Sequence, residues 1–247
     1  MIEKIDILGV KITPTNLPSA CQTIEEWIQV GAPKYICVVP VATIVECQSN
    51  ENFRRIVNRA DMATPDGMPV VWLGKLAGHK TIDRTYGPDL MREVCRLSAK
   101  KGYKIYLYGA TEPTCRRLEL KLLEQFPHLN IVGRFSPPFR PLSDEENDQV
   151  LSKINQADPD ILWIGLGSPK QDYWMSDYRA RLKVPVMVGV GAAFDFLSGA
   201  KRQAPAWMQR SGLEWFFRLC CEPRRLWKRY LLGNTKFIYF LLRERIK

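Results

Sequence analysis

Three glycine-containing turns have the composition of a phosphate-binding site. They begin at Gly109, Gly167 and Gly191, and each follows a short apolar segment rich in β-branched and aromatic residues. The first two lead directly into helix-like segments, whose free N–H groups and positive dipole end attract phosphate. Lys170 adds a mobile positive charge beside the second turn. The pattern indicates a nucleotide-diphosphate site, although glycine at such a turn also serves tight packing alone.

Two charged residues outside these turns could take part in catalysis. Asp66 lies in a Pro-Asp-Gly turn between two apolar segments, and Arg84 lies in a mostly uncharged loop. An aspartate in this position could act as a general base, or it could simply form the turn. The arginine could clamp a phosphate, or it could form a surface salt bridge. Spacing alone favours the structural interpretation at both positions.

Several familiar sites are absent or incomplete in the sequence. Gly165–Lys170 and Gly189–Phe194 resemble the dinucleotide fingerprint but lack its third glycine, and there is no Walker A motif. Asp158-Pro-Asp160 resembles a metal-binding pair, but it precedes a predicted strand, so we interpret it as a turn. The sequence has two histidines, which argues against a His-rich metal site or a Ser-His-Asp triad. Its seven cysteines have no C-x-x-C spacing, so we interpret them as buried or inert thiols in a reducing cytosol.

An α/β fold is predicted to position the turns. Buried apolar segments predict parallel strands, and helix-like segments lie between them. The predicted strands are Tyr35–Val39, Lys104–Tyr108, Ile161–Leu166 and Val186–Val190; the predicted helices are Glu112–Gln125, Ser143–Asn155 and Pro169–Arg181. This alternation indicates a Rossmann-like parallel-sheet core with right-handed crossovers. In such a sheet, ligands bind beyond the carboxyl ends of the strands, where the three turns are expected.

The periodicity changes after about residue 200. Residues 1–200 are predicted to form the catalytic domain and residues 201–247 a helical appendage. The appendage is predicted to contain three consecutive helices, Ala204–Cys221, Pro223–Leu232 and Thr235–Lys247. The chain has 36 basic and 26 acidic residues, but residues 200–247 alone have 12 basic and 3 acidic ones. This localised excess indicates one anionic partner rather than a coat of nucleic acid.

The segment Arg224–Leu231 is predicted to be an amphipathic helix. An aromatic and aliphatic face opposes a basic face, so the helix could lie in the surface of an anionic membrane; alternatively, it could dock on its own domain. We expect the following side chains to contact membrane or diphosphate: Arg218, Arg224, Arg225, Lys228 and Arg229. The segment Phe237–Leu242 is apolar on all sides, and no stretch reaches the roughly 20 apolar residues that span a bilayer. No signal peptide is visible, so we expect a cytoplasmic protein.

Taken together, these segments resemble the bacterial WecG/TagA/CpsF glycosyltransferases (glycosyltransferase family 26). The resemblance runs in order from about residue 35 to 240. It rests on Thr64–Met68, Arg84–Leu90, Gly165–Asp172, Gly189–Asp195, Arg202–Trp207, Gly212–Trp215, Glu222–Arg225 and Lys228–Tyr230. Each motif is weak alone, but the ordered set is highly specific.

The resemblance implies an inverting transfer of a sugar, of the hexose or N-acetylhexosamine type, from a UDP-sugar to a polyprenyl-diphosphate-linked saccharide. It implies no metal and no cofactor, and a place on the inner face of the cell membrane in envelope or exopolysaccharide synthesis. Asp66 matches the proposed base, and Arg84 is expected beside it in catalysis. The donor-binding residues are expected to be Gly109, Gly167, Ser168, Lys170, Gln171, Gly191 and Asp195.

One departure affects the expected donor. Many relatives have a polar T-x-N sequence where this chain has Val39-Pro40-Val41, and valine cannot supply the same hydrogen bonds. The sugar therefore cannot be carried over from better-known members. Homo-oligomers remain open. Two other classes of protein also remain open: a nicotinamide- or S-adenosylmethionine-dependent Rossmann enzyme, and a non-catalytic adaptor of a membrane assembly.

Overall fold

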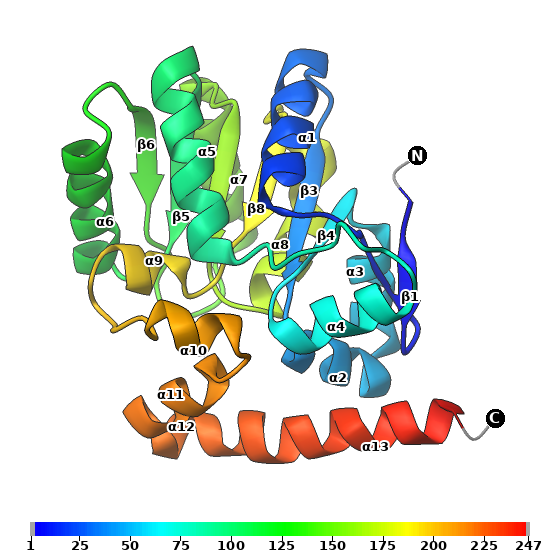
Figure 1. Cartoon of the computed structure of the whole chain (residues 1–247). Coiled ribbons are helices and arrows are strands. Elements are labelled where there is room, and N and C mark those ends of the chain that lie inside the picture. Colours follow the sequence, from blue (N-terminus) through cyan, green and yellow to red (C-terminus); the bar gives the residue numbers. More distant parts are fainter. Residues whose placement is uncertain (1–2, 246–247) are drawn as a thin grey trace. The chain divides into compact units, whose positions relative to one another are not determined.

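The computed structural model describes residues 3–245 and divides the chain into two compact units (Figure 1). Unit 1 contains the described residues of Met1–Asn16, Val38–Tyr86 and Gln203–Lys247. Unit 2 contains Leu17–Cys37 and Gly87–Arg202. The chain thus passes from unit 2 to unit 1 close to the predicted boundary at residue 200. The separate function assigned to residues 201–247 stays a prediction.

The main sheet is parallel, as predicted, with the strand order β4-β3-β8-β7-β5-β6. Four predicted strands are confirmed with small changes at their ends: β3 (Lys34–Val39), β5 (Lys104–Gly109), β7 (Ile161–Gly165) and β8 (Val186–Gly189). Two further strands, β4 (Met62–Pro65) and β6 (Asn130–Phe135), were not predicted. Their apolar segments are short or only half-buried, so their periodicity is weak. The Rossmann-like core is therefore confirmed.

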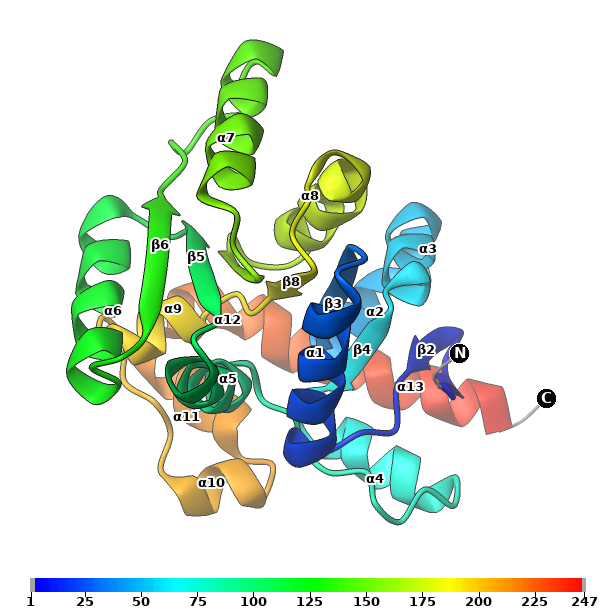
Figure 2. The same ribbon diagram turned by 90° about the horizontal axis from the view of Figure 1, so that it is seen from above.

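Helices cover both faces of the strands of unit 2. Figures 1 and 2 show α1 (Leu17–Val30) and α5 (Gly87–Lys101) on one face, and α7 (Asp144–Ala157) and α8 (Lys170–Tyr178) on the other. The capping box predicted at Ser143 is present, because its hydroxyl accepts from the Glu146 N–H and the Glu146 carboxylate accepts from the Ser143 N–H. The remaining helices of this unit are α6 (Glu112–Gln125), the 3-10 helix η1 (Arg179–Arg181) and α9 (Ala193–Leu197).

Unit 1 combines a hairpin, β1 (Ile5–Ile7) and β2 (Val10–Ile12), with helices from the two ends of the sequence. Its early helices are α2 (Val41–Ser49), α3 (Glu51–Arg59) and α4 (Met68–Leu76). The last helix, α13 (Gly233–Arg245), packs against α2 (Figure 1). The C-terminal segment is thus part of the packing of unit 1.

The predicted helix Ala204–Cys221 is wrong as one element. It is broken into α10 (Ala206–Arg210) and α11 (Glu214–Cys221). Gly212 lies between them with φ of +77°, a conformation that glycine adopts without a steric penalty. A Cβ atom there would also lie 3.1 Å from the Trp72 ring. The break turns α11 relative to α10.

The amphipathic segment is also less regular than predicted. It forms α12 (Pro223–Trp227) followed by the π-helical turn η2 (Lys228–Leu232). Leu226 and Phe237 are buried, and Tyr230, Phe240 and Leu241 are half-buried. The exposed large apolar side chains are Trp227, Leu231, Leu232, Ile238, Tyr239 and Leu242. The basic side chains of Arg224, Arg225, Lys228 and Arg229 are exposed too. Of the helix predicted over Thr235–Lys247, residues 246–247 lie outside the described residues. Over the part of the chain that is described, no helix has the length and apolarity needed to cross a membrane.

Candidate active site

Asp66 lies directly after β4, in a turn held by backbone hydrogen bonds. Its N–H donates to the Val39 carbonyl at 3.1 Å, and the Thr85 N–H donates to the Pro65 carbonyl at 2.9 Å. Both bonds hold the peptide group between Pro65 and Asp66, so they fix the backbone from which the carboxylate extends. The Asp66 side chain is only 18% exposed. The Pro-Asp-Gly turn therefore places a largely buried carboxylate, and not a solvated turn residue, at the end of the strand.

Arg84 is the nearest positive charge to Asp66. Its Nη2 lies 3.6 Å from Asp66 Oδ1 and contacts the carboxylate of Glu214 directly, and its side chain is 13% exposed. Gln209 Oε1 accepts from Nη1 at 3.2 Å, and the guanidinium lies 3.9 Å from the centre of the Tyr86 ring. Arg84 therefore belongs to a buried ion network, which argues against the surface salt bridge of the alternative interpretation. Its contact with a phosphate stays a prediction.

We call Asp66, Arg84, Tyr86 and Glu214 the Asp66 cluster. The sequence analysis missed Tyr86 and Glu214 as site residues. Glu214 Oε1 accepts from the Tyr86 hydroxyl at 2.8 Å, while Oε2 contacts Arg84. The available signal was an acidic residue in a strongly basic segment, within the matched motif Gly212–Trp215. The cluster joins the loop after β4 to α11, and all of its members belong to unit 1.

Burial raises the pKa of Asp66 from 3.8 to about 6. The positive charge of Arg84 acts in the opposite direction, Glu214 raises the pKa further, and Arg218 and Arg229 lower it. The phenol of Tyr86 has its pKa raised by burial and by the same carboxylates, so it stays a hydrogen-bond donor. Asp66 is thus ionised at neutral pH but is a stronger base than an ordinary aspartate, which suits general-base chemistry.

Asp66→Asn should stabilise the fold at neutral pH. Between pH 4 and pH 6 the unfolded chain releases the Asp66 proton and the folded chain retains it, so wild-type stability falls as the pH rises. The rise of the Asp66 pKa from 3.8 to about 6 corresponds to roughly 3 kcal/mol in the free energy of unfolding. Denaturant titrations should show the variant more stable than wild type at pH 7.5, with a difference that shrinks toward pH 4. A difference independent of pH would contradict the assignment.

Further cations lie on the C-terminal helices of unit 1. Arg218, on α11, lies 6.0 Å from the centre of the Tyr230 ring, and its charge and that of Arg229 act on Asp66. Arg225 instead pairs with Glu222. Of the predicted basic residues, Arg218 and Arg229 therefore act electrostatically on Asp66. Arg229 is exposed together with Arg224, Arg225 and Lys228.

The turns at Gly167 and Gly191 form a second cluster, within unit 2. Gln171 Oε1 accepts from the Gly167 N–H at 3.1 Å and from the Gly191 N–H at 2.9 Å, and Gln171 is buried. One amide oxygen thus ties the two turns together. Gln171 was predicted to bind the donor; here its oxygen is used to hold the turns, and direct contact with a donor stays a prediction.

The turn at Gly109 approaches the neighbouring strand closely. Gly109 has φ of +130°, and a Cβ atom there would lie 2.6 Å from the Gly165 carbonyl carbon. No other residue fits this position. The Ser136 hydroxyl donates to the Gly109 carbonyl at 3.3 Å. The packing explanation for this glycine is therefore sufficient by itself, and phosphate binding at this turn stays a prediction.

Asp172 is a second buried carboxylate, which the sequence analysis did not assign to the site. Burial raises its pKa to about 6, against hydrogen bonds from Ser168 and Cys37 that lower it. The Ser168 side chain, predicted to bind donor, thus bonds to Asp172. Asp195, another predicted donor residue, forms an ion pair with Lys201 at 2.9 Å. Lys170, at the first position of α8, is exposed.

Gln171→Leu should weaken donor binding without unfolding the chain. The substitution leaves the N–H groups of Gly167 and Gly191 without their acceptor, which costs about 1–3 kcal/mol for each buried group. The loosened turns should raise the KM for the donor more than tenfold. Gln171→Glu keeps an acceptor oxygen and should lose less. Initial rates at varied donor concentration test this; an unchanged KM in the leucine variant would show that the two turns do not hold donor.

The structure shows no candidate metal site within its described residues, defined as three or more His, Cys, Asp or Glu side chains that could hold one ion. The Asp158–Asp160 pair precedes β7, as expected. Asp160 accepts from the Lys104 N–H at 2.7 Å, and Asp158 pairs with the Lys104 side chain. Both aspartates therefore have structural partners, in agreement with the interpretation of this segment as a turn.

Unit 2 has glycine turns at the ends of its parallel strands, and unit 1 has a largely buried carboxylate beside Arg84. Each feature is typical of enzymes. The profile of the glycosyl transferase WecG/TagA/CpsF family matches residues 5–247. The chain belongs to this family, as the sequence resemblance indicated, and is a glycosyltransferase.

Three relatives share the name N-acetylglucosaminyldiphosphoundecaprenol N-acetyl-beta-D-mannosaminyltransferase. The Bacillus subtilis protein is 32% identical over 76% of this chain and 71% of its own length. The Bacillus spizizenii protein is 30% identical over 81% of this chain and 75% of its own length. The Staphylococcus aureus protein is 24% identical over 95% of this chain and 89% of its own length.

Proposed function

We propose that this glycosyltransferase moves a sugar from a UDP-sugar to a hydroxyl of a polyprenyl-diphosphate-linked saccharide, with inversion and without a metal ion. The names of the relatives support an N-acetylhexosamine as the sugar and an N-acetylglucosaminyl-diphosphoundecaprenol as the acceptor. The product would be a precursor of a cell-envelope polymer or an exopolysaccharide. The observation that carries the proposal is the buried Asp66 carboxylate beside Arg84.

In the proposed reaction Asp66 is the general base. The acceptor oxygen forms a bond to the anomeric carbon, and its proton passes to the Asp66 carboxylate. The bond from the anomeric carbon to the diphosphate oxygen breaks, and its electron pair leaves with UDP. A base with a pKa of about 6 is ionised at neutral pH and still accepts a proton effectively.

The departing diphosphate gains negative charge, which cations must stabilise. Without a metal ion this role falls to arginines and helix starts, and such electrostatic stabilisation contributes several kcal/mol. We assign it to Arg84, Arg218 and Arg229, whose charges all act on the Asp66 cluster. The glycine turns, with Ser168 and Lys170, are assigned to the donor nucleotide. Asp195 is assigned to the donor sugar.

Val39, Pro40 and Val41 are assigned to the donor site by the resemblance, since they replace the polar T-x-N sequence of many relatives. Val39 is buried, Pro40 precedes α2 and Val41 begins it. These residues offer no side-chain hydrogen bonds to a sugar hydroxyl or a base. The donor sugar must therefore be identified by screening UDP-sugars and measuring UDP release.

Membrane binding is assigned to the exposed face of α12, η2 and α13. These elements carry exposed aromatic and aliphatic side chains as well as the exposed Arg224, Arg225 and Lys228, a combination that matches an anionic membrane surface. We therefore propose a cytoplasmic enzyme bound to the inner face of the membrane that carries its acceptor. Self-association would be compatible with this surface; nucleic acid is not a proposed partner.

Ligand binding and turnover together test the proposed function. UDP at 100 times its dissociation constant should stabilise the chain by ~2.7 kcal/mol in a thermal-shift assay, and NAD or S-adenosylmethionine should not. UDP release should then require a synthetic polyprenyl-linked acceptor. Stabilisation by NAD or S-adenosylmethionine alone would point to another Rossmann-type enzyme. Failure to turn over any UDP-sugar, together with vesicle binding, would point to a membrane adaptor.

A further inference from the structure

Glu214 is an acidic residue of the Asp66 cluster that the mechanism above does not use. It is the first residue of α11, and its side chain is 12% exposed. Both carboxylate oxygens are engaged: Oε1 accepts from Tyr86 at 2.8 Å and Oε2 contacts Arg84. A buried carboxylate used on both oxygens is held in one orientation.

The guanidinium of Arg84 lies closer to the carboxylate of Glu214 than to the carboxylate of Asp66. Arg84 Nη2 contacts Glu214 directly, whereas its distance to Asp66 Oδ1 is 3.6 Å, beyond ordinary hydrogen-bond length. Gln209 holds Nη1 on the same side chain. The side chain of Arg84 is therefore held by Gln209 of α10 and Glu214 of α11. Its charge acts on Asp66 without a direct hydrogen bond.

This arrangement matters for the strength of the base. A carboxylate in direct contact with a guanidinium has a lowered pKa and is a weaker base. If Glu214 lost its charge, Arg84 would be free to move onto Asp66. The contact with Glu214 thus keeps the Arg84 charge close to Asp66 without a direct hydrogen bond that would weaken Asp66 as a base.

We propose that Glu214 is a positioning residue that holds Arg84 away from Asp66, so that Asp66 keeps the basicity needed for proton transfer. The inference rests on the proposed function of Asp66. It also assigns a role to α11: the helix supplies the side chain that sets the strength of the base.

The charges around Asp66 make the direction of the effect definite. The negative charge of Glu214 raises the pKa of Asp66, whereas the positive charges of Arg84, Arg218 and Arg229 lower it. The groups that face the cluster are Arg84, Arg218 and Arg229, with the phenols of Tyr86 and Tyr230. Removing the charge of Glu214 leaves the three arginines to act on Asp66, and cations favour the ionised carboxylate.

The test is the pH dependence of kcat/KM for Glu214→Gln. Glutamine keeps the size of the side chain and an acceptor oxygen but removes the charge. We expect the acidic limb of the profile to move to lower pH by at least about 0.5 unit. The plateau should fall at least about tenfold, because the base is weaker. The proposal would be overturned if the plateau of kcat/KM fell while the acidic limb stayed at the wild-type pH. Glu214 would then have only a structural role.

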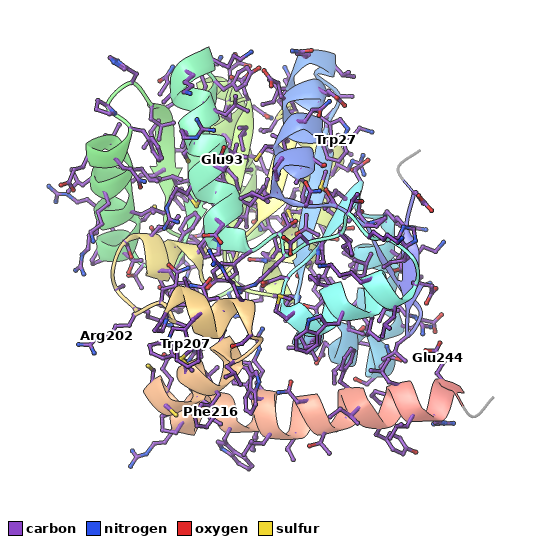
Figure 3. All side chains as sticks on the ribbon, viewed as in Figure 1. Trp27, Glu93, Arg202, Trp207, Phe216 and Glu244 are labelled. Atoms are coloured by element: carbon purple, nitrogen blue, oxygen red, sulfur yellow. The ribbon has the colours of Figure 1, made fainter. Side chains whose placement is uncertain are left out.

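Two further variants keep the test decisive. Glu214→Asp retains the charge on a shorter side chain, so its limb should stay at the wild-type pH even if the rate falls; a limb displaced as in the glutamine variant would also overturn the proposal. Glu93→Gln is the matched control, because it removes the same charge from α5 of unit 2, outside the Asp66 cluster and the helices assigned to the membrane (Figure 3). Its profile should match wild type.

Failure of the inference about Glu214 can be distinguished from failure of the proposed function. If wild type transfers no sugar, or if Asp66→Asn transfers it normally, then the proposed function fails regardless of Glu214. If wild type is active and depends on Asp66, but Glu214→Gln leaves the limb in place, then only the inference about Glu214 fails.

Discussion

Asp66→Asn should transfer sugar at least about 100-fold more slowly than wild type at pH 7.5. Asparagine keeps the size of the side chain and can still face Arg84, but it cannot take a proton from the acceptor hydroxyl. The loss should appear in kcat, because proton transfer occurs only in the reacting complex. UDP release in the presence of a polyprenyl-linked acceptor measures the effect, and the UDP thermal shift should be retained.

Asp158→Asn is the matched control for this substitution. Asp158 is exposed and has φ of +47°, a conformation that asparagine tolerates, so the chain should fold normally. Its activity should stay within about twofold of wild type, as for an ordinary surface substitution. Unchanged turnover in Asp66→Asn would remove this carboxylate from the mechanism, whereas equal losses in both variants would indicate a general effect on folding.

The triple substitution Arg224→Gln, Arg225→Gln, Lys228→Gln should weaken binding to anionic vesicles by about 100-fold. Each basic residue near such a surface contributes about 1 kcal/mol, and 1.4 kcal/mol is tenfold in affinity. The three side chains are exposed, so their loss should leave the core of unit 1 intact. Point substitutions suit this test better than removal of residues 201–247, because Leu226 and Phe237 are buried.

The control for the triple variant removes the same charge from α6. Arg116→Gln, Arg117→Gln, Lys121→Gln changes three exposed basic residues of unit 2, and vesicle binding should fall less than about threefold. Sedimentation with vesicles of defined anionic lipid content, at low and high salt, measures both variants. Equal losses in the two variants would mean that net charge, and not the C-terminal face, governs binding.

The sequence predicted the central strands because their signal is local. The apolar segments of β5, β7 and β8 are buried along most of their length and are followed by glycine turns. The segmentation of residues 204–232 could not be predicted in the same way. Whether Gly212 interrupts a helix depends on Trp72 and Met68, which lie far away in the sequence.

The candidate site shows the same difference between local and distant information. The Pro-Asp-Gly turn made Asp66 visible, but its partner Glu214 lies 148 positions further along the chain and enters through a contact with Arg84. Gln171 was assigned to the donor by resemblance, and its hydrogen bonds to two turns became visible only in the fold. Sequence spacing identifies groups that could react; burial and partners determine which of them can.

The central claim is that a carboxylate of raised pKa drives the transfer, and the pH profile of the wild-type enzyme tests it most directly. Initial rates of UDP release, measured from pH 4.5 to 8.5 as kcat/KM, should rise about tenfold per pH unit on the acidic side and level off above about pH 6. The small residual activity of Asp66→Asn should lack this limb. A wild-type rate that is flat across pH 6, or a limb that persists in Asp66→Asn, would contradict the account.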